Sequence, residues 1–192
     1  MGREFELKYR ADERSITAIQ GKFGEFTPIS METSYYDTAD GILNRLHWTL
    51  RRRYENGISV CTLKTPAAGS GRGEWEVRAP DIAAALPLLQ KLDTPEGLRF
   101  FSADALVLSC GARFTRLAKT LEIPGAVVEL ALDRGFLLGG GQELPFAEVE
   151  AELKEGSEEA VLAFAQELAA EFSLEPEPKS KHARAMALAR QK

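Results

Sequence analysis

The chain has 192 residues, with 24 lysines and arginines against 29 aspartates and glutamates, for a formal net charge of −5. This length suits one domain that buries a core without disulfides, and a hydrophobic share of 44% argues against disorder. An acidic chain repels phosphate on average, so the composition disfavours a protein that binds nucleic acid through bulk electrostatics.

Cysteine content and hydropathy limit the cellular setting. Cys61 and Cys110 are too few for a disulfide framework, and they favour a reduced environment. No apolar run reaches the length of a membrane span, and the charged N-terminus has no signal-peptide core. We therefore expect a cytoplasmic protein with no membrane partner.

Alternating apolar and charged residues predict a strand over residues 3–10, and Asp12 is placed to cap a helix that runs to about residue 23. Asn56-Gly57 predicts a hairpin between two of the later strands. Ser157 would cap a helix over 157–172, and 175–179 reads as a proline-rich linker. The further strands are expected at 33–38, 47–54, 58–65, 72–78, about 112–122, 126–133, 134–138 and 145–154, and the further helices at 81–92 and 181–190. This inventory favours one α+β domain whose sheet curls or closes.

The charged faces of these strands are sorted by sign. Any one of them could be an ordinary solvated face, but the pattern repeats: carboxylates gather on the first and last strands, and cations on the strands between. The residues in phase are Glu4, Glu6 and Lys8; Arg51 and Arg53; Lys64; Arg72, Glu74, Glu76 and Arg78; Arg116; Glu129 and Asp133; and Glu148, Glu150 and Glu152. The opposite faces are mostly apolar and can pack under the helices.

A closed sheet with these faces inward would form a polar lumen with acidic and basic sides. Carboxylates without histidine or thiolate partners suit Mg²⁺ or Mn²⁺, and arginines and lysines at alternate positions match phosphate oxygens. Because Arg113 and Lys119 lie an odd number of residues from Arg116, period-2 geometry places them on the opposite face from it. The pattern therefore indicates a metal-assisted site for a polyphosphate.

A series of short motifs, in order along residues 3–188, resembles the CYTH superfamily of triphosphate tunnel metalloenzymes. The motifs are Glu4-Phe5-Glu6-Leu7-Lys8 (ExExK), Tyr35-Tyr36-Asp37-Thr38, Leu50-Arg51-Arg52-Arg53, Thr62-Leu63-Lys64, Arg72-Gly73-Glu74-Trp75-Glu76, Glu129 through Gly135, Glu148 through Lys154, and Ser180-Lys181-His182-Ala183-Arg184. The resemblance is to bacterial inorganic triphosphatases in particular.

The resemblance implies an eight-stranded antiparallel β-barrel at about 3–155 that forms a charged tunnel, with peripheral helices at 157–172 and 180–190, in a single domain over 1–192. It implies metal ligands at Glu4, Glu6, Glu74, Glu148, Glu150 and Glu152. It implies phosphate binding by Lys8, Arg51, Arg53, Lys64, Arg72, Arg116, Lys181 and Arg184, and catalytic roles for Lys8, Glu6, Glu76 and Arg53. In the related triphosphatases a helical CHAD domain often follows, so the chain is either a stand-alone protein or an excised domain.

The resulting hypothesis is Mg²⁺- or Mn²⁺-dependent hydrolysis of inorganic triphosphate to pyrophosphate and phosphate. Three alternatives stay open. The same tunnel could act on thiamine triphosphate or a nucleoside triphosphate, or as a class IV adenylyl cyclase, with Trp48 or Tyr36 stacking on the ring. The chain could bind polyphosphate without catalysis, or its charged faces could simply be solvated. The sequence assigns neither an oligomeric state nor a general base.

Overall fold

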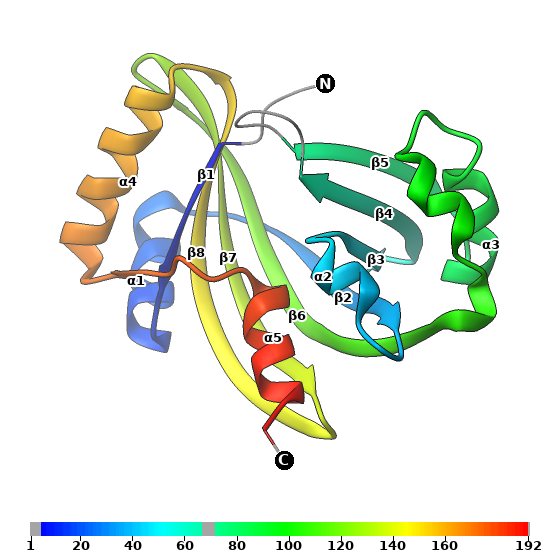
Figure 1. The fold of residues 1–192 in the computed structure, drawn as a ribbon. Coiled ribbons are helices and arrows are strands. Elements are labelled where there is room, and N and C mark those ends of the chain that lie inside the picture. Colours follow the sequence, from blue (N-terminus) through cyan, green and yellow to red (C-terminus); the bar gives the residue numbers. More distant parts are fainter. Residues whose placement is uncertain (1–4, 67–71, 192) are drawn as a thin grey trace.

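The computed structural model describes residues 5–66 and 72–191. Its strands are β1 (Glu6–Arg10), β2 (Thr27–Thr38), β3 (Thr49–Glu55), β4 (Ile58–Pro66), β5 (Arg72–Arg78), β6 (Leu106–Ile123), β7 (Ala126–Gly139), β8 (Gln142–Gly156) and β9 (Glu175–Pro176). Its helices are α1 (Glu13–Phe23), α2 (Ile42–Arg45), α3 (Ile82–Leu89), α4 (Glu158–Phe172) and α5 (Lys181–Ala189). The strands form one curved antiparallel sheet in the order β5-β4-β3-β2-β6-β7-β8-β1-β9 (Figure 1).

The α+β class and the antiparallel sheet with peripheral helices are confirmed. The described sheet has a ninth strand of two residues, and its hydrogen bonding does not run all the way round, because the strand order begins at β5 and ends at β9. The edge of β1 that would meet β5 in a closed barrel is partly taken by β9, which pairs with Tyr9 and Arg10. The sheet is therefore strongly curved but open, and it surrounds a central space.

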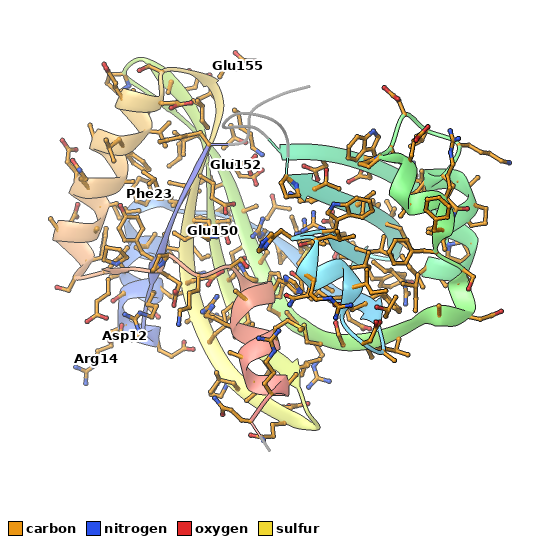
Figure 2. All side chains as sticks on the ribbon, in the orientation of Figure 1. Asp12, Arg14, Phe23, Glu150, Glu152 and Glu155 are labelled. Atoms are coloured by element: carbon orange, nitrogen blue, oxygen red, sulfur yellow. The ribbon has the colours of Figure 1, made fainter. Side chains whose placement is uncertain are left out.

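Local signals in the sequence explain several elements. The Asp12 side chain accepts a hydrogen bond of 2.8 Å from the backbone N–H of Ser15, which caps α1 as predicted, and Figure 2 labels Asp12 and Phe23 at the two ends of this helix. Asn56 and Gly57 both have positive φ (45° and 93°), so the predicted hairpin of β3 and β4 is confirmed. The capped α4 and the C-terminal α5 are confirmed as well.

The long strands differ from their expected bounds. β2 begins at Thr27 rather than at 33, β6 runs for 18 residues rather than over about 112–122, and β8 begins at Gln142. The strands expected at 126–133 and 134–138 are one strand, β7. Each extension is held by the neighbouring strand's hydrogen-bond ladder, which local residue patterns do not report.

Helices α1, α3 and α4 cover the outer, apolar faces of the sheet, whereas α5 packs on the concave side against Tyr35 and Phe114. Ile16 and Ile19 of α1 and Val161 and Leu168 of α4 pack with Leu130 and other apolar residues of β1, β7 and β8. A second cluster joins α3 to β3 and β4, and a third joins α5 to β2, β6 and β7. This arrangement leaves the charged strand faces on the concave side. No helix in the described part of the chain is both long and apolar enough to cross a membrane.

Candidate active site

The concave side of the sheet encloses a cavity of about 290 Å³. Six cationic side chains and three carboxylates reach its wall from β1, β3, β4, β6, β8 and α5. Its lining residues are Glu6, Lys8, Thr33, Tyr35, His47, Thr49, Arg51, Arg53, Lys64, Thr65, Phe114, Arg116, Glu150, Glu152, Ser180, Lys181 and His182. The sorted strand faces predicted from the sequence thus meet in one place.

Strand register explains why these side chains converge. Opposite residues in an antiparallel pair point to the same face, and Glu6 lies opposite Glu152 while Lys8 lies opposite Glu150. On the other side of the cavity, Lys64 of β4 lies opposite Thr49 of β3. The pairing of β1 with β8 therefore gathers carboxylates on one wall of the cavity, and the pairing of β3 with β4 gathers cations on another.

The three cations of β6 separate by face, as the period-2 argument predicted. Arg116 lines the cavity. Arg113 points away and forms an ion pair of 3.2 Å with Glu143, and the Nζ of Lys119 donates to the carbonyl oxygen of Phe23 on α1. Arg116 is therefore the one of these three cations that faces the cavity.

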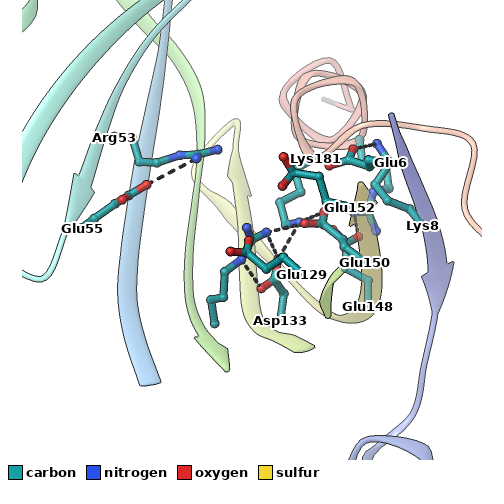
Figure 3. Close-up of polar contacts among 12 residues, drawn as sticks. Glu6, Lys8, Arg53, Glu55, Glu129, Asp133, Glu148, Glu150, Glu152 and Lys181 are labelled. Atoms are coloured by element: carbon teal, nitrogen blue, oxygen red, sulfur yellow. Dashed lines mark hydrogen bonds and ion pairs between the residues drawn. The ribbon is translucent and has the colours of Figure 1, made fainter. Parts of the chain in front are cut away.

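A buried ion network joins the acidic wall to α5. The guanidinium of Arg116 donates to both carboxylate oxygens of Asp133, each at 2.8 Å. The Nζ of Lys181 lies 2.8 Å from a carboxylate oxygen of Asp133 and 2.8 Å from one of Glu150, and it also contacts Glu148. Figure 3 shows Lys181 reaching from α5 in among these carboxylates. Arg116 also binds Glu150, so cations and carboxylates alternate through the network.

The network sets the protonation of its members. Burial alone would raise the pKa of Glu150, but the charges of Lys181 and Arg116 outweigh it and lower that pKa to about 2. Burial likewise works against charge on Lys181, yet the carboxylates of Glu150, Asp133 and Glu148 raise its pKa. For Glu148, burial and the charge of Glu150 prevail over Lys181 and Arg184, and its pKa is raised. Lys181 and Glu150 are therefore both charged at neutral pH.

The cations of the basic wall contact carboxylates of β3 and β5. Lys64 lies 3.2 Å from Glu74 on β5, and Arg53 lies 3.3 Å from Glu55, apart from the acidic cluster in Figure 3. The Nε of Arg53 is buried and has no hydrogen-bond partner among the described residues. A buried donor without a partner carries a desolvation cost that a phosphate oxygen would relieve.

Not every predicted site residue reaches the cavity. Glu76 is exposed on the edge strand β5, and Glu74 contacts the wall through Lys64 and Arg51. Glu148 and Arg184 lie behind the wall, where they bind each other. Glu4 and the side chain of Arg72 lie outside the described residues. The lining brings together the other predicted residues: Glu6, Lys8, Arg51, Arg53, Lys64, Arg116, Glu150, Glu152 and Lys181.

The structure adds residues that the sequence reasoning did not place in the site. Asp133 is fully buried at the centre of the ion network. The rings of Tyr35 and His182 lie 4.6 Å apart at the cavity wall, and burial lowers the pKa of His182 against the nearby charge of Asp37. Tyr35 belongs to the Tyr35-Tyr36-Asp37-Thr38 motif and His182 directly follows Lys181, and these positions were the signals available in the sequence. By contrast, Trp48 and Tyr36 pack in the cluster under α3.

The donor set suits a hard divalent cation. Carboxylate oxygens of Asp133, Glu148 and Glu150 all lie within 4.8 Å of one another, although Lys181, Arg116 and Arg184 already contact them. Glu6 and Glu152, in register on β1 and β8, bring two further carboxylates to the cavity wall. Oxygen ligands without thiolate are the set that Mg²⁺ and Mn²⁺ prefer.

The sequence and the fold of this chain are similar to those of known proteins. An inorganic triphosphatase of Haemophilus influenzae is 25% identical over 175 residues, which cover 88% of this chain and 50% of that protein, so the chain spans about half the length of this relative. Among solved structures, a Hippeastrum protein superposes with a TM-score of 0.74 at 21% identity, and the match covers 96% of this chain and 95% of that one. That protein is described as an adenylyl cyclase candidate with a dominant triphosphatase activity. An adenylate cyclase candidate of Bacillus halodurans gives 0.66 at 23% identity, covering 93% and 94%.

A family model also matches this chain. The family model described as the CYTH domain matches residues 2–186, nearly the whole chain. Together with the shared fold of the solved structures, this match shows that the chain belongs to the CYTH domain family.

Proposed function

We propose that this protein is a divalent-metal-dependent inorganic triphosphatase, which hydrolyses triphosphate to pyrophosphate and phosphate. The observation that carries the proposal is the convergence of six cationic side chains on one small cavity beside an acidic wall. Cations from separate strands and from α5 surround the space, so a short chain of phosphates could contact several at once.

The size and lining of the cavity favour a small inorganic anion over a nucleotide. Its volume of about 290 Å³ lies just below the ~300–1,000 Å³ typical of sites for drug-sized ligands. Trp48 and Tyr36, the two residues considered for stacking on a base or thiazolium ring, belong to the packing cluster under α3. The cavity therefore offers mainly charged and polar partners for phosphate oxygens, and the rings in its lining are those of Tyr35, His47, Phe114 and His182.

Roles follow from position. Lys8, Arg51, Arg53, Lys64, Arg116 and Lys181 would bind phosphate oxygens and offset the charge that develops on the leaving pyrophosphate. Glu6, Glu150 and Glu152 would hold Mg²⁺ or Mn²⁺, which when bound supplies Lewis-acid stabilisation of the phosphates. Glu6 also lies 3.2 Å from Lys8, so the acidic wall on β1 carries a cation beside one of its carboxylates. A carboxylate such as Glu6 is placed to orient an attacking water.

The relatives support the same proposal from outside. The inorganic triphosphatase of H. influenzae is named for this reaction, and the Hippeastrum protein is described by its dominant triphosphatase activity. The proposal includes a cytoplasmic location, in keeping with the buried free thiols of Cys61 and Cys110.

The substrate choice is tested by turnover of triphosphate, ATP and thiamine triphosphate under identical Mg²⁺ or Mn²⁺ concentrations. We expect kcat/KM for triphosphate to exceed that for either organic substrate by about 100-fold, because triphosphate fits the small polar cavity and the larger organic substrates do not. A higher kcat/KM for ATP or thiamine triphosphate would overturn the assignment to inorganic triphosphate while keeping the tunnel as the site.

A further inference from the structure

The segment between α4 and α5 was expected to be a proline-rich linker, but it forms backbone hydrogen bonds with β1 beside the site. Its residues 175–176 form β9 on the edge of β1. One residue further on, the backbone N–H of Glu177 donates to the carbonyl oxygen of Lys8 at 2.9 Å. The segment therefore ends its run along β1 beside a residue whose side chain lines the cavity.

The side chain of Glu177 is buried, at 8% exposure, in this segment. One carboxylate oxygen accepts the backbone N–H of Lys179 at 3.0 Å. The other lies 3.7 Å from Nη1 of Arg184 and 3.9 Å from Nε of Arg10. A buried carboxylate retains its charge at low cost only when cations face it, and here the more buried of the two cations is Arg184.

Arg184 connects Glu177 to the cavity. Its Nη2 binds Glu148, which is fully buried and in turn binds Lys181. Arg184 and Lys181 lie three residues apart, on one side of the first turns of α5. A chain of close contacts thus runs from Glu177 through Arg184 and Glu148 to the ammonium group of Lys181 on the cavity wall.

We infer that Glu177 is a positioning residue for the triphosphate site: it holds Arg184, and through Arg184 and Glu148 it fixes α5 and Lys181 at the cavity. This role rests on the proposed function for its effect on triphosphate. Without the negative charge, Arg184 keeps one of its two described carboxylate partners. The first turn of α5 then loses its tie to the segment, and Lys181 is held less firmly among its carboxylates.

The test compares Glu177→Gln with Glu175→Gln. The amide introduced by the first change can still accept the backbone N–H of Lys179, but it carries no charge for Arg184. Glu175 is the matched control, because it lies in the same segment, is 74% exposed and pairs only with Arg10 among its described ion pairs, at 3.1 Å. Two readouts are taken: hydrogen exchange of the α5 backbone amides, and the Kd of sodium tripolyphosphate by calorimetry without metal, where nothing is hydrolysed.

We expect E177Q to speed exchange across α5 and to raise the Kd about tenfold, the effect of weakening one charge-assisted contact, while E175Q leaves both within about twofold. In an Arg184→Met background, E177Q should add nothing to the Kd, because its effect acts through Arg184. If E177Q acted only by disturbing the structure elsewhere, its effect on the Kd would add to the effect of R184M.

Three results separate the conclusions. E177Q and E175Q behaving alike in both readouts would overturn the positioning role, and so would an E177Q effect on the Kd that persists undiminished in the R184M background. A wild-type protein that binds no tripolyphosphate would refute the proposed function, and α5 exchange in E177Q would then still decide whether Glu177 positions the helix.

Discussion

The buried charges at the candidate site are held by charged partners. Asp133 is fully buried and receives two hydrogen bonds from Arg116 and an ion pair from Lys181. A buried ion pair contributes little net stability, but removing one partner leaves a charge that is costly to bury. The two hydrogen bonds from Arg116 to Asp133 therefore serve to keep a charged network in place at the site.

Arg116 and Arg113 on β6 form a matched pair for testing this point. Arg116→Met removes one of the two described cations that contact the carboxylates of Asp133 and Glu150 and leaves Lys181. We expect it to lower the free energy of unfolding by about 3 kcal/mol and to weaken triphosphate binding. Arg113→Met breaks an exposed ion pair with Glu143 and a surface cation–π contact with Phe136, so the free energy of unfolding should change by less than about 0.5 kcal/mol. Urea titration of both variants measures the difference, and equal losses would contradict the network.

The two thiols offer a test of burial through pH. Burial raises the pKa of both Cys61 and Cys110 to about 11, so at pH 8 very little reactive thiolate is present in the folded protein. Labelling with a thiol reagent should stay slow at pH 8, accelerate only as the pH approaches 11, and reach both thiols at once in urea. Rapid labelling of the native protein at pH 8 would show that these sites are open.

Single residues also mark how far sequence reasoning reaches. Alternation along β6 separates Arg116 from Arg113 and Lys119, and the resemblance to the CYTH family selects Arg116 as the inward residue; in the structure Arg116 lines the cavity. Asp133 was in phase with the charged faces, but its importance depends on β6, β7 and α5 meeting, which no local pattern reports. Glu76 was chosen from its motif, yet β5 is an edge strand, and its side chain is exposed there.

At the scale of elements, α5 decides the shape of the site. It carries Lys181 to the cavity and docks against the end of β7, where its backbone passes very close to Gly139. The capped helices and the Asn-Gly hairpin could be predicted because their signals are local. The full lengths of β2 and β6 could not, since cross-strand pairing rather than residue preference holds their ends.

Gly139→Ala tests the docking of α5. A Cβ at this position would lie 2.5 Å from the carbonyl oxygen of Ala185 and 2.7 Å from the amide nitrogen of Ala189, so the helix must shift. We expect a loss of about 1–3 kcal/mol in unfolding free energy, together with weaker triphosphate binding.

The matched control is Gly21→Ala in α1, where a Cβ would meet nothing within 4 Å. Removing a helical glycine there should stabilise the protein by about 0.5–1 kcal/mol and leave triphosphate affinity unchanged. Chemical denaturation and calorimetry on both variants give the comparison. A Gly139→Ala protein with native stability and native affinity would show that α5 need not sit so close to β7.

At the scale of the whole molecule, the distribution of charge reconciles an acidic chain with the anionic substrate that we propose. The net charge of −5 is an average, whereas the curved sheet gathers six cations on one cavity and leaves many carboxylates on the outer helices or in ion pairs. A small polyanion responds to the local field inside the curl rather than to the average. The sorting of charge by strand was visible in the sequence, and the register of the sheet converts it into a site.

The most direct test of the central claim is ³¹P NMR of tripolyphosphate incubated with the wild-type protein and Mg²⁺ or Mn²⁺. We predict that pyrophosphate and phosphate appear in equal amounts, that chelation of the metal stops the reaction, and that Lys8→Met slows it by about 100-fold or more through loss of a cavity-wall cation. Tripolyphosphate that stays intact with either metal would contradict the claim.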